Sequence, residues 1–329
     1  MITIGVTTGE TRREACRVEH YRYSLSINAA TDRGDFVVMF CGEADVVGGH
    51  YIGPAVHDYF LVHVVTAGEG TFETLGQKYR LKKGDAFLIF PDILVKYEAS
   101  KETPWTYMWI GFSGDQTEKA LGRIGITPER AALRGLSPIK MRELFGSIRD
   151  SLDNGATPEL GSMAASGCLR LVLHEMGVAA LAGNAPENGV TGIDGGDGEP
   201  RIMSHQPSEG GRPMNRPLPE DAIPGRQQQI DQAIRMLSYQ YGQHISIGEI
   251  ARKLGYHRAH LTKLFKETTG LSPMQYLNKI RMKKAEKLLA GDLTIAQVAA
   301  SVGFNDPLFF TKQFRKWRGV SPTEFRKSL

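Results

Sequence analysis

Two short segments near the C-terminus carry side chains whose chemistry suits the bases and phosphates of DNA. In each, apolar residues at helical spacing define an inward face, formed by Leu261, Leu264 and Phe265 in the first segment and by Phe310, Phe314 and Trp317 in the second. The outward faces carry cationic, hydroxyl and small apolar side chains: Arg258, Ala259, Thr262, Lys263 and Lys266 in the first segment, and Leu308, Thr311, Lys312 and Arg315 in the second. Lysine can donate to guanine O6 and N7, and threonine or leucine methyl groups can contact a thymine methyl. The pattern predicts two DNA-contacting helices, in which any one of these side chains could equally stay solvated or contact phosphate.

A sequence duplication surrounds the two segments. Residues 245–256 are answered by residues 293–304, 48 positions later, with matching chemistry at each step. The motifs that follow, Phe-Lys and Gly-x-Ser-Pro, recur 49 positions later as Phe-Arg and Gly-x-Ser-Pro. A fixed offset of this kind indicates one supersecondary unit written twice.

Each copy begins and turns in the same way. Ser246 with Glu249, and Thr294 with Gln297, have the spacing of a capping box at the start of a helix. A glycine follows in each copy, at 255 and 303, where a tight turn requires positive φ. Helix, glycine turn and second helix form the helix-turn-helix unit, whose second helix enters the major groove.

Residues 226–329 resemble the tandem helix-turn-helix domain of the AraC/XylS family of bacterial transcription regulators. The family signature is matched at the following positions: Gly303-Phe304, Phe309-Phe310, Phe314-Arg315, Gly319, Ser321-Pro322 and Phe325. Between the copies, a helix over residues 273–290 is expected to extend about 27 Å. Successive major grooves lie about 34 Å apart, so one chain is expected to span two of them.

The charge of the chain is unevenly distributed. The whole chain carries a net charge of +4. Residues 226–329 hold 18 Lys and Arg against 7 Asp and Glu, a net charge of +11, while residues 1–225 have a net charge of −7. A basic end on an acidic body suits a polyanion bound at one end only. The three cysteines are too few and too widely spaced for a disulfide framework or a zinc pattern. No segment approaches the roughly twenty apolar residues of a membrane-spanning helix, and we expect a cytoplasmic protein.

The N-terminal part has a β pattern. Residues 1–35 are expected to form an arm ending in a strand, and residues 36–112 show short alternating or apolar runs separated by Gly and Pro turns. Gly84-Asp85 with Phe90-Pro91 resembles a cupin jelly roll. We expect residues 1–114 to form the arm and an effector-binding barrel.

Two helical patterns and a linker follow. Ser137-Pro138 and Pro158 start two helices within residues 115–182. In the AraC/XylS family such a pair provides the dimer contact, although the pair could instead only cover the barrel. Residues 183–225 contain 9 Gly, 7 Pro and no aromatic residue, which is typical of a flexible linker.

The barrel is expected to hold an effector rather than a metal. Alternation places Trp105, Tyr107 and Trp109 on one face of a strand. The candidate effector-binding residues are Tyr97, Tyr107, Trp109, Trp105 and His63, of which Tyr97 and Trp109 match sugar-contacting positions of the arabinose-type sensor by resemblance. These aromatic residues could also be only core. His63 lacks the neighbouring histidine that a metal-binding cupin carries, so we expect no metal, no cofactor and no catalytic residue.

The sequence therefore predicts an α+β multidomain protein: a cupin-like β-barrel with a helical dimerisation pair, and an all-α tandem helix-turn-helix domain at residues 226–329. We expect a homodimeric, sequence-specific DNA-binding protein that activates carbohydrate-utilisation genes. Its expected partners are a sugar effector and RNA polymerase. The alternatives are a regulator with another effector or none, and a metal-dependent cupin enzyme fused to a DNA-binding domain. The operator, the effector and the sign of regulation are left open.

Overall fold

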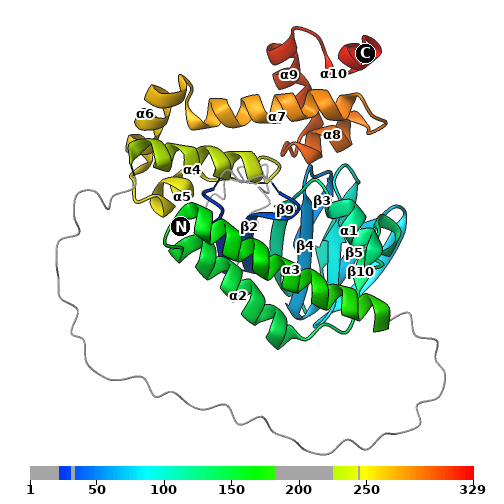
Figure 1. Cartoon of the computed structure of the whole chain (residues 1–329). Helices are drawn as coiled ribbons and strands as arrows, with labels where there is room; N and C mark the ends of the chain where they lie inside the picture. The colour runs from blue at the N-terminus through cyan, green and yellow to red at the C-terminus, as the bar shows by residue number, and fades with distance from the viewer. Residues whose placement is uncertain (1–21, 31–33, 183–224, 244) are drawn as a thin grey trace, which may run out of the picture. The chain divides into compact units, whose positions relative to one another are not determined.

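The computed structural model describes residues 22–30, 34–182, 225–243 and 245–329, which fall into two compact units divided between Met176 and Gly177 (Figure 1). The first unit is β-rich with helices on one face, and the second is all helical. This arrangement confirms the predicted α+β fold with a β-rich N-terminal part and a helical C-terminal part. Most of the expected arm, residues 1–21 and 31–33, and the expected linker, residues 183–224, lie outside the described residues.

Two antiparallel sheets pack face to face in the first unit. The six-stranded sheet has the order β1-β2-β9-β4-β7-β10, and the four-stranded sheet has the order β3-β8-β5-β6. The strands are β1 (Arg22–Ile27), β2 (Val37–Asp45), β3 (Tyr51–Ala55), β4 (Phe60–Ala67), β5 (Glu69–Thr74), β6 (Gln77–Lys82), β7 (Ala86–Ile89), β8 (Val95–Ala99), β9 (Thr106–Ser113) and β10 (Ala132–Leu133). The strand expected at the end of the arm is β1.

The central strands are buried on both faces. In β9, Tyr107 and Trp109 face the second sheet, and the alternate residues Met108 and Ile110 are also buried. Helices cover the outer face of the six-stranded sheet, so both sets of side chains are removed from water. The strands β5 and β6 are joined by a two-residue turn in which Leu75 and Gly76 both have positive φ, as a tight hairpin requires.

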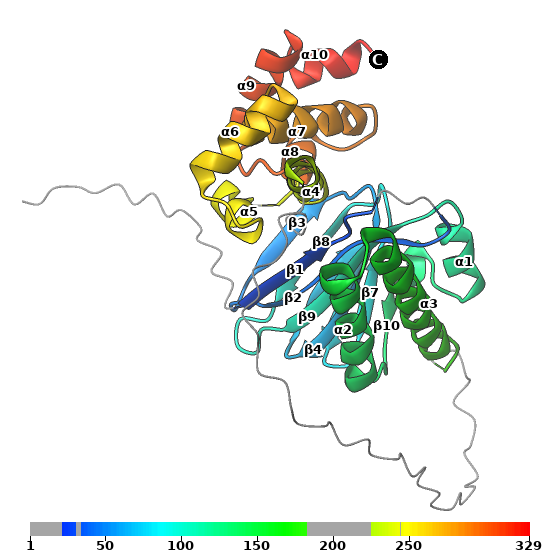
Figure 2. The ribbon, with the colours of Figure 1, turned by 60° about the vertical axis from the view of Figure 1, so that its left-hand side comes forward.

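The covering helices are α2 (Pro138–Asn154) and α3 (Pro158–Ala182), which lie side by side across the sheet (Figure 2). A short helix α1 (Thr117–Arg123) and a 3₁₀ turn η1 (Pro128–Arg130) precede them. The Ser137 hydroxyl accepts from Lys140 N at the start of α2, with proline at the first helical position. Both helices begin where the Ser-Pro and Pro signals predicted.

Helix α3 corrects one expectation about apolar length. It has 25 residues and an 18-residue window of mean hydropathy 1.2, which by length and composition suffices to cross a membrane. Part of this window, 39%, is buried, and the Ser162 hydroxyl accepts a hydrogen bond from the buried amide of Asn28. A helix that covers a sheet in a soluble domain has the same length and composition.

The second unit contains α4 (Arg226–Tyr239), α5 (Ile247–Lys253), α6 (Arg258–Thr269), α7 (Pro273–Leu289), α8 (Ile295–Ser301), α9 (Pro307–Arg318) and α10 (Pro322–Lys327). Helices α5 and α6 contact each other, as do α8 and α9, and α7 contacts members of both pairs. The chain therefore forms two helix-turn-helix copies joined by one helix. With 17 residues, α7 is about 25 Å long.

The two turns use glycine as predicted. Gly255 and Gly303, which follow α5 and α8, have φ of 75° and 82°, a left-handed conformation that favours glycine. The capping box at the start of α8 is complete, because Thr294 Oγ1 accepts from Gln297 N and Gln297 Oε1 accepts from Thr294 N. At α5 only one of the two bonds, from Glu249 N to Ser246, is present.

Candidate DNA-contacting helices and candidate effector site

Helix α6 separates its side chains as expected of a recognition helix. Leu261, Leu264 and Phe265 are buried against the unit. The candidate DNA-contacting residues Arg258, Ala259, Lys263 and Lys266 are exposed, and Thr262 is half-buried. The Thr262 hydroxyl donates to the Arg258 carbonyl at 2.8 Å, which fixes the side chain against its own helix.

Helix α9 repeats this arrangement 49 residues later. Phe310 and Phe314 are buried, while Lys312 and Arg315 are exposed. Leu308 in the first turn of α9 is 74% exposed, so its apolar side chain is not stabilised by burial within the unit. The Thr311 hydroxyl donates to the Pro307 carbonyl at 2.8 Å. The pairs Thr262 and Thr311, Lys263 and Lys312, and Lys266 and Arg315 therefore occupy matching positions of two helices.

One expected core residue of α9 lies at the surface. The sequence grouped Trp317 with Phe310 and Phe314 on the inner face, but Trp317 is 41% exposed. Its indole N–H donates to Glu286 Oε1 on α7 at 3.0 Å. This polar partner, 31 residues away, keeps the edge of the ring at the surface and attaches the end of α9 to α7.

In the first unit, the candidate effector-binding residues form one aromatic cluster between the two sheets. The His63 ring stacks on Phe87 with 4.5 Å between ring centroids, and Tyr97 and Tyr107 each lie 5.1 Å from His63. Trp105 and Trp109 flank Tyr107 at 5.9 Å and 5.7 Å. All five candidates are thus brought together, and all are buried, Trp109 least so at 7% exposure.

Several polar atoms in this cluster have no hydrogen-bond partner in the described residues. These atoms are Trp105 Nε1, His63 Nδ1 and, nearby, His57 Nε2. A buried polar atom without a partner costs free energy and needs a physical explanation, of which a bound water or ligand is one. The cluster can therefore offer a donor and acceptors to a polar molecule that contacts aromatic faces.

The two histidines are neutral. Burial lowers the pKa of His63 to about 3, with His57 contributing, and burial lowers the pKa of His57 to about 4 against the opposing effect of Asp58. The cluster therefore carries no imidazolium at neutral pH. Among the described residues there is no group of three or more His, Cys, Asp or Glu side chains that could hold a metal ion. The arrangement suits an uncharged ligand with hydroxyl groups.

Two glycines that the sequence did not single out support the tryptophan rings. A Cβ added at Gly42 of β2, the register partner of Trp109, would lie 2.4 Å from Trp109 Cζ2. A Cβ added at Gly70 of β5 would lie 2.4 Å from Trp105 Cε3. Glycine inside a strand is itself a signal of close approach, but the sequence does not show which ring approaches.

Taken with the exposed recognition helices, these features define a DNA-binding transcription regulator with a separate ligand-binding domain. A model of the AraC-like ligand binding domain matches residues 36–166, and a model of a helix-turn-helix domain matches residues 250–328. The lactose operon transcription activator of Staphylococcus xylosus is 30% identical over 269 residues, which cover 81% of this chain and 83% of that protein. The chain belongs to the AraC family of transcription regulators.

Two further relatives align over most of their length. The Msm operon regulatory protein of Streptococcus mutans is 29% identical over 298 residues, 90% of this chain and 94% of that protein. The raffinose operon transcriptional regulatory protein of Pediococcus pentosaceus is 24% identical over 298 residues, 89% of this chain and 94% of that protein. The similarity to these regulators thus covers both units and not the helix-turn-helix copies alone.

Proposed function

We propose that this chain is a cytoplasmic, non-enzymatic activator of a carbohydrate-utilisation operon, and that it responds to a mono- or oligosaccharide bound between the two sheets. The observation that supports a sugar as the effector is the neutral aromatic cluster, in which polar atoms of Trp105 and His63 have no hydrogen-bond partner in the described residues. Sugars offer C–H faces to aromatic rings and hydroxyls to such atoms. The names of the relatives, which regulate lactose, raffinose and Msm operons, support the same class of effector.

Calorimetric titration tests the effector. Sugars found to stabilise the wild-type chain in a thermal-shift screen are titrated into wild type, Trp109→Ala and the control Tyr51→Ala, which removes a ring that is 44% exposed on β3. We expect Trp109→Ala to abolish binding and Tyr51→Ala to leave it unchanged. If no sugar binds wild type, or if Trp109→Ala binds as tightly as wild type, the cluster is only core.

DNA binding is proposed to use the outward faces of α6 and α9. The +11 charge of residues 226–329 and the exposure of the cations on both helices support it. If about six phosphates are neutralised, the log–log dependence of affinity on salt should have a slope of about −5. A slope near zero would contradict the assignment, and a reporter driven by the bound promoter, with and without sugar, gives the sign of regulation. Activation further requires that the bound chain recruit RNA polymerase.

The proposed homodimer uses an exposed, mostly apolar stripe on α3. The stripe residues recur at intervals of four and three and lie on one side of the helix: Leu160, Ala164, Gly167, Leu171, His174, Val178 and Leu181. This is the period of a two-helix seam. In an antiparallel pair of α3 helices Leu171 would meet its own copy, Leu160 would meet Leu181, and the bulky His174 would meet Gly167.

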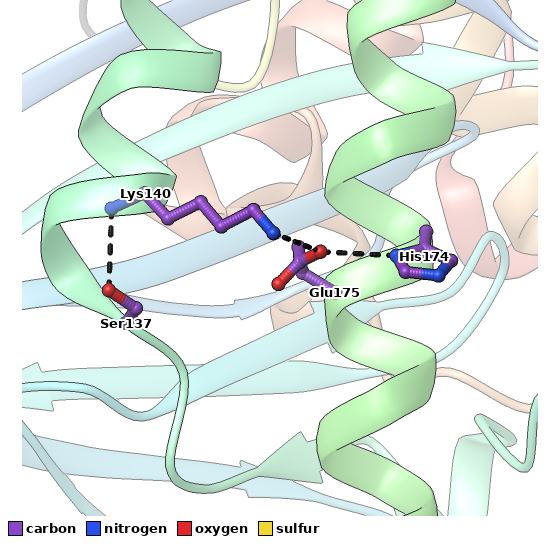
Figure 3. Close-up of polar contacts among 4 residues, drawn as sticks. All are labelled: Ser137, Lys140, His174 and Glu175. Carbon is purple, nitrogen blue, oxygen red and sulfur yellow. Dashed lines mark hydrogen bonds and ion pairs between the residues drawn. The ribbon is translucent and has the colours of Figure 1, made fainter. Parts of the chain in front are cut away.

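A polar cluster borders this stripe (Figure 3). Lys140 of α2 contacts Glu175 at 2.7 Å, and the His174 ring lies 3.1 Å from the same carboxylate. Lys140 and then His174 hold the pKa of Glu175 below its usual value. The contact ties α2 to α3 beside the proposed seam, so the two helices present one surface to a partner.

Analytical ultracentrifugation of Leu171→Glu tests the dimer. We expect a wild-type dimer and a monomeric variant, because a carboxylate would be buried against its own copy. Ile139→Glu is the matched control, since Ile139 is 70% exposed on α2 and is not part of the stripe. A dimer that survives Leu171→Glu but not Ile139→Glu would move the interface to α2.

A further inference from the structure

One side chain in the middle of α7 contacts both helix-turn-helix copies. Arg281 Nε donates to the Tyr241 carbonyl at 2.8 Å, and an Arg281 terminal nitrogen donates to the Gln243 carbonyl at 3.0 Å. Tyr241 and Gln243 belong to the connection between α4 and α5 in the first copy. The guanidinium therefore holds the segment that leads into the first helix-turn-helix.

The same guanidinium lies on the turn of the second copy. Its centre is 5.4 Å from the centroid of the Phe304 ring, and a Cβ added at Gly303 would lie 2.7 Å from its terminal nitrogen. The backbones of the two copies also meet here, because a Cβ added at Gly242 would lie 2.9 Å from the Ser301 carbonyl at the end of α8. Arg281 thus lies where the α4–α5 connection packs directly on the α8–α9 turn.

The chemistry of arginine suits this place. Burial lowers the pKa of Arg281 to about 10, so the group stays charged at neutral pH. A planar guanidinium donates to two acceptors in a fixed geometry and stacks on an aromatic ring at the same time. A lysine ammonium on a flexible stem cannot hold both carbonyls in one orientation.

We propose that Arg281 is a positioning residue, which fixes the separation and rotation of α6 relative to α9 so that one chain binds two DNA blocks at a single spacing. The inference rests on the proposed DNA binding through both helices. Without the guanidinium the two copies remain joined by α7 (Figure 1), but the α4–α5 connection loses the polar link that orients it on the second turn. The first copy can then tilt on α7 to follow a displaced DNA block.

Spacing is a sensitive measure of such a role. Inserting one base pair between two blocks moves one of them by about 3.4 Å along the duplex and rotates it by about 35°. A rigid pair of recognition helices cannot follow this displacement with both sets of base contacts. A pair that has lost the Arg281 contacts follows the displaced block more easily, but it binds the original spacing with lower affinity.

The experiment begins with duplexes selected from a random pool by the full-length wild-type chain. Because the proposed dimer presents two such chains, the spacing is varied only within the pair of blocks that one chain binds. This pair is tested at the selected spacing and with one base pair inserted or deleted between its blocks. Wild type should lose about tenfold or more in affinity at each altered spacing, since misalignment removes at least one base contact. Arg281→Met should bind the selected spacing more weakly than wild type does. Its affinities for the three duplexes should lie within about threefold of one another, because the loss of even one base contact would produce a larger difference.

Arg326→Met is the matched control. Arg326 on α10 donates to the Leu289 and Leu293 carbonyls, at 3.1 Å and 2.5 Å, and so holds the α7–α8 connection within the second copy. Its loss removes the same kind of contact without touching the first copy. We expect a similar drop in thermal stability and an unchanged spacing preference. Arg281→Lys keeps the positive charge but lacks the planar guanidinium that donates to two carbonyls. It should also lose the spacing preference, and it tests the positioning role if Arg281→Met does not fold.

The outcomes separate the two proposals. A wild-type chain that selects no sequence overturns the proposed function and the role of Arg281 with it. If wild type selects two blocks but the Arg281 variants keep its spacing preference, only the positioning role is overturned. A loss of preference in Arg326→Met equal to that in Arg281→Met would also overturn it, because general destabilisation would then explain both.

Discussion

The two helix-turn-helix copies share their sequence pattern but differ in how firmly each is held. At the turn of the first copy, a Cβ added to Gly255 would meet no atom within 4 Å. At the second, a Cβ on Gly303 would meet both Arg281 and the Tyr241 carbonyl. The first glycine is needed for its backbone conformation alone, whereas the second is also needed for space. Duplication preserved the shape of the turn, and the packing between copies added a second constraint to one of them.

The recognition helices differ in the same sense. Asp306 caps α9 by accepting from Leu308 N at 2.8 Å, while His257 at the same place on α6 makes no side-chain cap bond. Phe314 contacts Phe310 at 5.8 Å between ring centroids, whereas the residue of α6 that matches Phe310 is Leu261. The contact to the following helix is the same in both copies, Phe265 with Tyr276 at 5.4 Å and Phe314 with Phe325 at 5.5 Å. We therefore expect α9 to be held more firmly than α6, and the first copy to tolerate substitution better than the second.

The largest effect that tests this difference is expected at the turn glycines. Gly303→Ala should lower the free energy of unfolding of the helical unit by about 3 kcal/mol, because it combines positive φ with a clash against a backbone carbonyl. Gly255→Ala should cost about 1 kcal/mol, from positive φ alone. Urea unfolding followed by helical circular dichroism compares them. Equal costs would mean that the Gly303 turn relaxes freely and that the copies are not docked.

The next effect concerns DNA. Lys312→Ala should weaken binding to a guanine-bearing site by about 2 kcal/mol and relax specificity in its own block. Lys263→Ala should cost about 1 kcal/mol, because the uncapped α6 holds its side chains less firmly before binding. Competition binding with selected and scrambled duplexes measures both. A loss from Lys312→Ala that is equal on every sequence would assign Lys312 to a phosphate contact.

The helix caps should give a smaller difference. Asp306→Ala removes the only side-chain acceptor at the start of α9 in the described structure and should cost about 1 kcal/mol of stability. His257→Ala at the matching position of α6 should change stability by no more than a few tenths of a kcal/mol. Thermal unfolding in the same buffer tests the pair. A cost at His257 as large as that at Asp306 would contradict the asymmetry between the recognition helices.

The smallest expected difference lies in the two capping boxes. Gln297→Ala removes the bond to Thr294 N, which is 2.8 Å long, and should cost about 0.5 kcal/mol. Glu249→Ala removes no reciprocal bond that the described structure contains, so it should be near neutral. Hydrogen exchange at the first turns of α8 and α5 resolves effects of this size. Faster exchange in Glu249→Ala alone would mean that the complete capping box lies at α5 and not at α8.

Much of this architecture could be predicted because the signals are local. Ser137-Pro138 and Pro158 fixed the starts of α2 and α3, and the turn glycines marked the two helix-turn-helix copies, since each depends only on residues within one turn. The surface position of Trp317 could not be predicted, because it depends on Glu286 in another helix. Arg281 gave no signal for the same reason: its partners lie about 40 residues before it.

The sequence predicted which residues form the candidate effector site, but it did not predict how they are arranged. Alternation over residues 105–109 placed Trp105, Tyr107 and Trp109 on one face, and the structure brings His63 and Tyr97 to them from two other strands. The burial of Met108 and Ile110 on the opposite face depends on helices that follow in the chain. Alternation predicts which side chains share a face, but the packing partner of each face is decided by tertiary structure.

The glycines beneath the two indole rings leave no room for a side chain from two directions. A Cβ at Gly42 would meet the Ser24 carbonyl as well as the Trp109 ring, and a Cβ at Gly70 would meet the Glu98 carbonyl as well as the Trp105 ring. A larger residue therefore fits at neither position unless a neighbouring strand moves together with the ring. Under the proposed sugar binding, a library at Gly42 and Gly70 for construction of a biosensor is expected to disturb the sheets before it reshapes the site.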